Sequence, residues 1–159
     1  METNTLTFNN LNREISNFVD DFVETYKSIL ISQGKTATGN LIKSIKREQN
    51  TIENNIITGQ ISIAEYWKYV EYGRKPGKFP PKEKISKWID DKGIQLPTPS
   101  NGITMTKQQL TFLISRKIAQ YGIKPGNQFE EALEITWKNH EILMNRAIQK
   151  DIDEFLNKI

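Results

Sequence analysis

The first quarter of the chain carries a long row of apolar side chains at helical spacing. They recur every three or four positions as Phe8, Leu11, Ile15, Phe18, Phe22, Tyr26 and Ile29, with Val19, Val23 and Leu30 beside them. This period predicts one amphipathic helix, capped at its start by Asn9 or Asn10 and ended by Gly34. At about 1.5 Å per residue the helix is ~36 Å long, enough to cross a domain of this size.

The end of the chain shows a second long apolar row. From Asn127 to Lys158 one side of the expected helix carries Phe129, Leu133, Trp137, His140, Met144, Ile148 and Phe155. Acidic residues in its first turn favour the positive end of the helix dipole. The sequence therefore predicts long helices at both ends of the chain.

Two isoleucine-rich segments between these helices predict a β-hairpin. They are Ser44–Ile52 and Ile56–Ile63, and the connection contains Asn54 and Asn55, which tolerate the positive φ of a tight turn. Ile57, Gly59, Ile61 and Ile63 are expected on the face that a helix covers. The predicted fold class is α+β, with a small antiparallel sheet between flanking helices.

Shorter helices are expected in the rest of the chain, each followed by a turn or a glycine. Their predicted ranges are 38–43, with Thr38 as cap, 64–72, 82–92 and 107–121. Prolines and glycines in 94–106 predict a projecting loop or loose hairpin there.

Composition narrows the choice of architecture and chemistry. The chain has 159 residues and no cysteine, which predicts a single domain in residues 1–159 and excludes disulfides and thiolate metal sites. With one histidine, a histidine-based zinc site is excluded too, and no cofactor is expected. No apolar run approaches a membrane span, and the first residues do not resemble a signal peptide, so we expect a soluble protein without membrane contact.

Isolated motifs do not predict an enzyme. Gly34-Lys35-Thr36 ends like a phosphate-binding loop, but Ile29 stands where its first glycine is required. The doublets Asp20-Asp21 and Asp90-Asp91 point about 100° apart on a helix and cannot face one substrate. His140, on the apolar side of the last helix, is expected to be a packed, hydrogen-bonded residue rather than a catalytic base.

Charge is unevenly distributed along the chain. The net charge is +3, yet residues 67–92 hold eight lysines and arginines against four acids, whereas residues 1–31 hold five acids against two cations. The acidic start and basic middle predict complementary faces.

The basic middle also contains interleaved aromatic residues, from Tyr66 to Phe79. Cations and rings together are typical of nucleic-acid surfaces, where they contact phosphates and stack on bases. A core helix followed by a solvated basic loop explains the same residues. So does a protein–protein contact, because Tyr, Trp and Arg are enriched at interface centres.

Three separated segments together resemble the gp10-like family of HK97-type phages. They are residues 38–45 (TGNLIKSI), residues 69–73 (YVEYG) with Pro80-Pro81 and the helix after them, and residues 114–125 with 129–132. Order and spacing agree over about residues 38–133. The resemblance implies an α+β fold with an antiparallel sheet, and a tail-completion or head–tail joining protein without enzymatic activity.

The resemblance also implies partners and a location. Members form homo-oligomeric rings, of sixfold or twelvefold symmetry, in the virion neck between portal or adaptor and tail proteins, after assembly in the host cytoplasm. The residues expected at a subunit or partner interface are Tyr69, Glu71, Tyr72, Arg74, Lys75, Lys78 and Phe79. Lys82, Lys84 and Lys87 are candidates to face the passing genomic DNA, without sequence preference. The alternative is a small nucleic-acid-binding protein that uses the surface of residues 67–92.

Overall fold

The computed structural model describes residues 6–34, 39–98, 102 and 104–158. Its helices and strands follow in the order α1 (Asn9–Ser32), α2 (Asn40–Ser44), β1 (Lys46–Glu53), β2 (Ile56–Ser62), α3 (Trp67–Glu71), α4 (Lys82–Asp91), α5 (Lys107–Tyr121) and α6 (Gln128–Leu156). Packing separates the chain into two compact units. Unit 1 comprises residues 1–33, 42–64 and 128–159, and unit 2 comprises residues 34–41 and 65–127.

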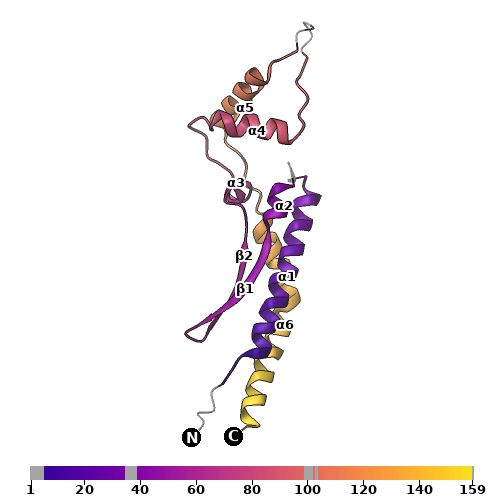
Figure 1. The fold of residues 1–159 in the computed structure, drawn as a ribbon, viewed down its shortest axis with the longest axis vertical. Helices are drawn as coiled ribbons and strands as arrows, with labels where there is room; N and C mark the ends of the chain where they lie inside the picture. The colour runs from indigo at the N-terminus through magenta and orange to yellow at the C-terminus, as the bar shows by residue number, and fades with distance from the viewer. Residues whose placement is uncertain (1–5, 35–38, 99–101, 103, 159) are drawn as a thin grey trace. The chain divides into compact units, whose positions relative to one another are not determined.

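Unit 1 is built on an antiparallel pair of long helices, α1 and α6, which lie side by side (Figure 1). The aromatic rings of Phe22 and Tyr26 on α1 contact Phe129 on α6, with centroids 4.9 and 5.5 Å apart. Near the other end of the pair, Asn10 of α1 is bonded to Asp151 of α6. Both predicted terminal helices are confirmed.

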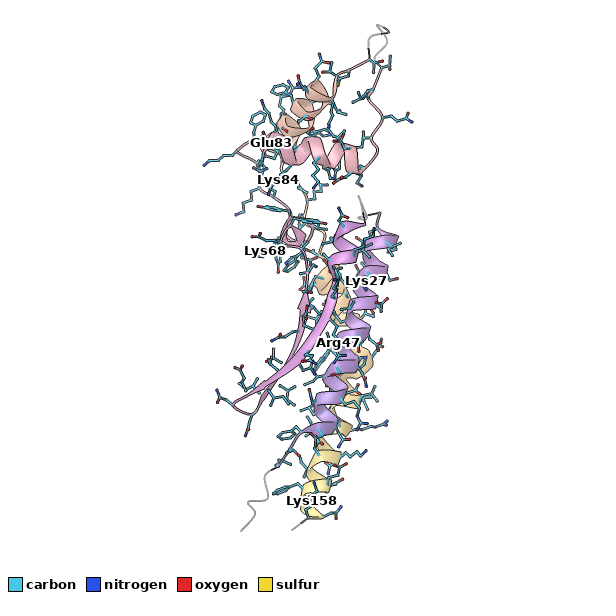
Figure 2. All side chains as sticks on the ribbon, viewed as in Figure 1. Lys27, Arg47, Lys68, Glu83, Lys84 and Lys158 are labelled. Carbon is cyan, nitrogen blue, oxygen red and sulfur yellow. The ribbon has the colours of Figure 1, made fainter. Side chains whose placement is uncertain are left out.

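The β-hairpin of unit 1 lies against α1 (Figure 1). Asn54 and Asn55 have φ of 50° and 63°, as the predicted two-residue turn requires. Gly59 faces α1 so closely that a Cβ there would lie 2.6 Å from a methyl group of Val19. Arg47 of β1, labelled in Figure 2, pairs with Asp20 of α1 at 3.4 Å.

The fold class is therefore α+β, as the sequence predicts, but the layers differ in one respect. The terminal helices do not hold the sheet between them, because they pack against each other and the two-stranded sheet lies on α1. A two-stranded hairpin buries too little apolar surface to fill the space between two long helices. The helix pair is consequently the centre of unit 1.

Unit 2 contains α3, α4 and α5 with their connecting loops. The α4 and α5 helices pack together, and an ion pair joins Lys107 to Asp90 at 2.5 Å. Thr106 and Gln109 form a capping box at the start of α5. Beside it, the backbone amide of Met105 donates to the carbonyl of Pro97, which joins the two described arms of the 94–106 segment.

Of the predicted helix caps, one is not tested and one differs in the structure. Thr38 lies outside the described residues. Asn9 and Asn10 lie inside α1, whose first residue is preceded by Phe8, and neither supplies a side-chain cap. The cap comes instead from α6, through the Asp151 carboxylate, because a residue distant in sequence can accept the amide hydrogens of a first turn as well as a local one.

Candidate interaction surface

Two segments fifty residues apart meet in unit 2 through backbone hydrogen bonds. The amide of Arg74 donates to the carbonyl of Ile123 and the amide of Ile123 donates to the carbonyl of Arg74, both at 2.8 Å. The amide of Gly126 also donates to the carbonyl of Glu71 at 2.8 Å. These bonds form the Arg74–Ile123 bridge, which fixes the start of the 74–79 loop.

Glycine is required on both sides of this bridge. Gly73 and Gly122 have φ of 66° and 72°, in the left-handed region that side chains disfavour. A Cβ at Gly73 would lie 2.2 Å from the Ile123 carbonyl oxygen, and one at Gly122 would lie 2.1 Å from the Arg74 carbonyl oxygen. The two segments can approach this closely only because neither residue has a side chain.

The rest of the 74–79 loop is held by two further bonds. The amide of Gly77 donates to the carbonyl of Ala119 at 2.7 Å, and the Arg74 guanidinium donates to the carbonyl of Lys78 at 2.7 Å. Arg74, predicted as an interface residue, is therefore half-buried and supports its own loop. Lys75 and Lys78 remain exposed on it.

Aromatic side chains at this surface are largely exposed. Phe79 is 51% exposed and stacks on Phe112 of α5, with ring centroids 6.1 Å apart. The Arg116 guanidinium lies 5.9 Å above the same Phe112 ring. Tyr69 and Tyr72 are 58% and 68% exposed. Apart from Arg74, the predicted aromatic and basic interface residues are thus open to a partner.

Glu71 differs from the other predicted interface residues. Its side chain is 2% exposed, so it does not belong to the surface that this conformation presents. Its backbone carbonyl accepts hydrogen bonds from the amides of Gly126 and Asn127, next to the Arg74–Ile123 pair. Glu71 is an acidic residue within a basic stretch, and nothing in the local sequence indicates whether such a residue is buried or exposed.

The predicted DNA-facing lysines lie along α4. Lys82, Lys84 and Lys87 are all exposed, and Figure 2 labels Lys84 on this helix. None of the three has an ion pair among the described residues. They are available to contact an anionic partner.

Net charge separates the two units more sharply than the linear sequence suggests. Unit 2 contains thirteen lysines and arginines against five acids, a net charge of +8. Unit 1 contains nine against fourteen, a net charge of −5. The last helix, which supplies half of these fourteen acids, joins the acidic N-terminal segment only in the folded chain.

A cluster of ionisable groups around the buried His140 joins α1 to α6 in unit 1. His140 is 4% exposed; its Nδ1 lies 2.7 Å from a Glu14 carboxylate oxygen and its Nε2 lies 2.8 Å from one of Asp21. Because both ring nitrogens face acceptors, both bonds form only when His140 is an imidazolium. Burial acts to lower the pKa of His140, but the two carboxylates outweigh it and the pKa is raised.

The predicted role of His140 as a packed, hydrogen-bonded residue is thereby confirmed. Its ring also contacts Phe18 edge to face, with centroids 5.6 Å apart. The i and i+7 spacing of Glu14 and Asp21 puts both carboxylates on one face of α1. That spacing is visible in the sequence, but the facing position of His140 is not.

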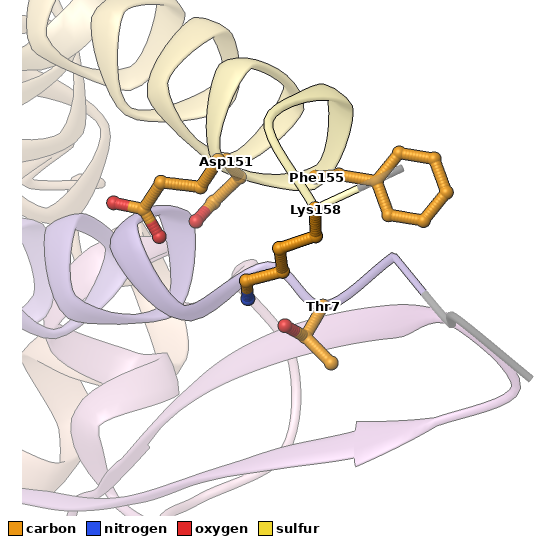
Figure 3. Close-up of a pocket in the computed structure, with 5 residues that line it drawn as sticks. Thr7, Asp151, Phe155 and Lys158 are labelled. Carbon is orange, nitrogen blue, oxygen red and sulfur yellow. The ribbon is translucent and has the colours of Figure 1, made fainter. Parts of the chain in front are cut away.

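Asp151 forms a second buried anionic site. Its carboxylate accepts hydrogen bonds from the backbone amides of Asn10 and Leu11, both at 2.9 Å, and from the Asn10 side chain at 2.8 Å. Burial acts to raise the pKa of Asp151, but these donors outweigh it and lower the pKa. Figure 3 shows Asp151 beside a hollow lined also by Thr7, Phe155 and Lys158. Its volume of about 10 Å³ holds no more than a water molecule.

The described residues contain no group of three histidines, cysteines or acids able to hold a metal ion. Over the same part of the chain, none of the helices combines the length and apolar composition needed to cross a membrane. A scan against protein-family models and searches of curated proteins and solved structures gave no match.

Proposed function

We propose that the chain is a structural subunit of the head–tail connector of a tailed bacteriophage. It forms a homo-oligomeric ring, sixfold or twelvefold, that joins portal or adaptor to tail proteins and lets DNA pass. It acts in the virion neck after assembly in the host cytoplasm, and it has no enzymatic activity.

One observation carries most of the support. Two of the three segments that resemble the connector family, residues 69–73 and 114–125, are joined in space by the Arg74–Ile123 bridge. Gly73 and Gly122 both belong to these segments and both permit the close approach. The resemblance therefore includes residues that this backbone arrangement requires, and this supports the proposal.

The exposed surface next to the bridge suits a structural role. A ring whose subunits contact head to tail needs two different complementary surfaces on each copy. Unit 2 offers exposed Tyr69 and Tyr72 at α3, and exposed Phe79 and lysines on the 74–79 loop, which four hydrogen bonds hold. A loop fixed in this way loses little conformational entropy on binding.

The test is to look for the chain in purified phage particles. Mass spectrometry of virions should detect it, and electron cryomicroscopy should place its density in a ring between capsid and tail. Disruption of its gene should leave filled or empty heads without attached tails. Virions that lack the chain, with normal tail attachment after disruption, would refute the proposal.

A nucleic-acid-binding protein is the second candidate, favoured by the net charge of +8 on unit 2. Duplex DNA binding should then weaken with salt, with a log–log slope reduced by roughly three when Lys82, Lys84 and Lys87 are changed together to glutamine. The matched control changes Lys138, Lys150 and Lys158 of unit 1. A monomer that binds DNA with this dependence and is absent from virions would favour the second candidate.

A further inference from the structure

One face of α6 combines acidic and large apolar side chains that the helix pair leaves exposed. Leu133, Glu134, Trp137 and Glu141 follow one another at spacings of one, three and four residues, which places them on one side of the helix. Leu133 is 42% exposed and Trp137 is 49% exposed. We call these four residues the acidic apolar face; Lys138 borders it.

This exposure divides the apolar row that the sequence shows on the last helix. Phe129 and His140 of the predicted apolar row contact α1, whereas Leu133 and Trp137 of the same row are exposed. The buried residues that complete the seam are smaller or polar: Gln128, Ala132 and Thr136. The small side chains of Ala132 and Thr136 allow close approach of α1. The larger residues are consequently displaced to the edge, where Trp137 touches Phe18 edge to face at 6.3 Å.

Unit 2 carries a surface of opposite character. Lys78, Phe79, Phe112 and Arg116 lie on the 74–79 loop and on α5, joined through the stacked rings of Phe79 and Phe112. All four are exposed. We call them the basic aromatic face.

We propose that the basic aromatic face of one copy of the chain binds the acidic apolar face of a second copy. The inference deepens the proposed function, on which it rests for the assembly of copies. Each face pairs two large apolar side chains with two charges, and the charges of the two faces are opposite in sign. Apolar contact supplies affinity, and charge complementarity selects the register and the partner.

A second copy fits this chemistry better than a nucleic acid. The acidic apolar face belongs to a unit of net charge −5, which repels phosphates. The two faces lie on different units of the chain. When two copies bind through one basic aromatic face and one acidic apolar face, each copy therefore keeps its other face free for a further copy. Such a heterologous contact can be repeated from copy to copy.

Cross-linking in trans tests the inference, because the natural chain has no cysteine. Lys78→Cys and Glu134→Cys are prepared as separate full-length chains, one of them isotope-labelled, and mixed with a short bismaleimide. Only contact between copies gives the mixed product. The matched control pairs Lys78→Cys with Glu24→Cys, since Glu24 is an exposed acid elsewhere on unit 1.

The mixed product should form about tenfold faster for Lys78 with Glu134 than for the control pair. Adding Trp137→Lys and Glu141→Lys to the Glu134→Cys chain should abolish this preference, because the apolar contact of Trp137 is lost and two cations then face Arg116. Equal rates for the two pairs would overturn the inference. So would the absence of mixed product, either at concentrations where the natural chain self-associates or, if it does not, throughout the micromolar range.

Failure here is distinguishable from failure of the proposed function. A chain found in the virion neck without preferential cross-linking keeps the connector function and rules out this contact. Preferential cross-linking by a chain absent from virions keeps the contact and rules out the connector function.

Discussion

Side chains hold unit 1 together, whereas backbone hydrogen bonds between glycine-containing segments hold the loops of unit 2. In unit 1 the seam between α1 and α6 contains a charged cluster around His140 and the Asp151 cap. In unit 2 the bridge between Arg74 and Ile123 depends on Gly73 and Gly122. The two units should therefore respond to different classes of substitution, and the following four experiments test that difference.

The largest effect is expected from Asp151→Ala. It leaves the amides of Asn10 and Leu11 and the Asn10 side chain without their buried acceptor, and should lower the free energy of unfolding by about 3 kcal/mol or more. Urea denaturation followed by circular dichroism measures the loss. Asp153→Ala, at an exposed position nearby, should change stability by no more than about 0.5 kcal/mol. Equal effects of the two variants would contradict the assigned cap.

Gly73→Ala should destabilise unit 2 by about 2–4 kcal/mol, through its positive φ and the overlap with Ile123. Hydrogen exchange resolved along the chain should show faster exchange at the bridge and unchanged protection in α1 and α6. Gly93→Ala is the matched control, with φ of 58° and no atom within 4 Å of an added Cβ, and should cost only about 1 kcal/mol. Loss of protection in α1 would show that the units do not respond independently.

Stability of unit 1 should depend on pH through His140. Because its pKa is raised in the folded state, the imidazolium contributes fully below the unfolded pKa of about 6.5 and is lost as pH rises through the folded pKa. NMR titration of the chain's one histidine should place its pKa above 6.5. His140→Gln should remove the decline in stability at alkaline pH that this group causes. A histidine pKa at or below 6.5 would contradict the double hydrogen bond.

Asp151 gives the opposite dependence in acid. Its lowered pKa means that its contribution is present above the ordinary carboxyl value and is lost as pH falls through the folded pKa. Together the two groups put the greatest stability of unit 1 in the mildly acidic range between their titrations.

The smallest effect is expected from the exposed lysines of α4. Changing Lys82, Lys84 or Lys87 to glutamine should alter stability by no more than about 0.5 kcal/mol each, because each is exposed. Thermal melting of the three single variants measures this. A larger loss at any one of them would show that its charge supports unit 2 rather than remaining available to a partner.

The sequence by itself determines the secondary structure well. Apolar spacing predicts α1 and α6, the Asn54-Asn55 pair predicts the hairpin turn, and the Thr106 and Gln109 pair would have predicted the cap of α5. These features are local, since helix period, turn φ and capping depend on residues only a few positions apart. The aromatic and basic residues of the candidate surface are also visible as an interleaved stretch in the sequence.

Only the tertiary structure decides which features meet. It pairs α1 with α6 instead of placing the sheet between them, moves Leu133 and Trp137 to the surface, and buries Glu71. It also brings His140 between two carboxylates and Gly73 against Ile123. These outcomes depend on how closely two backbone segments that are distant in sequence approach each other. The side-chain volumes of both segments set that distance, so neither segment alone predicts it.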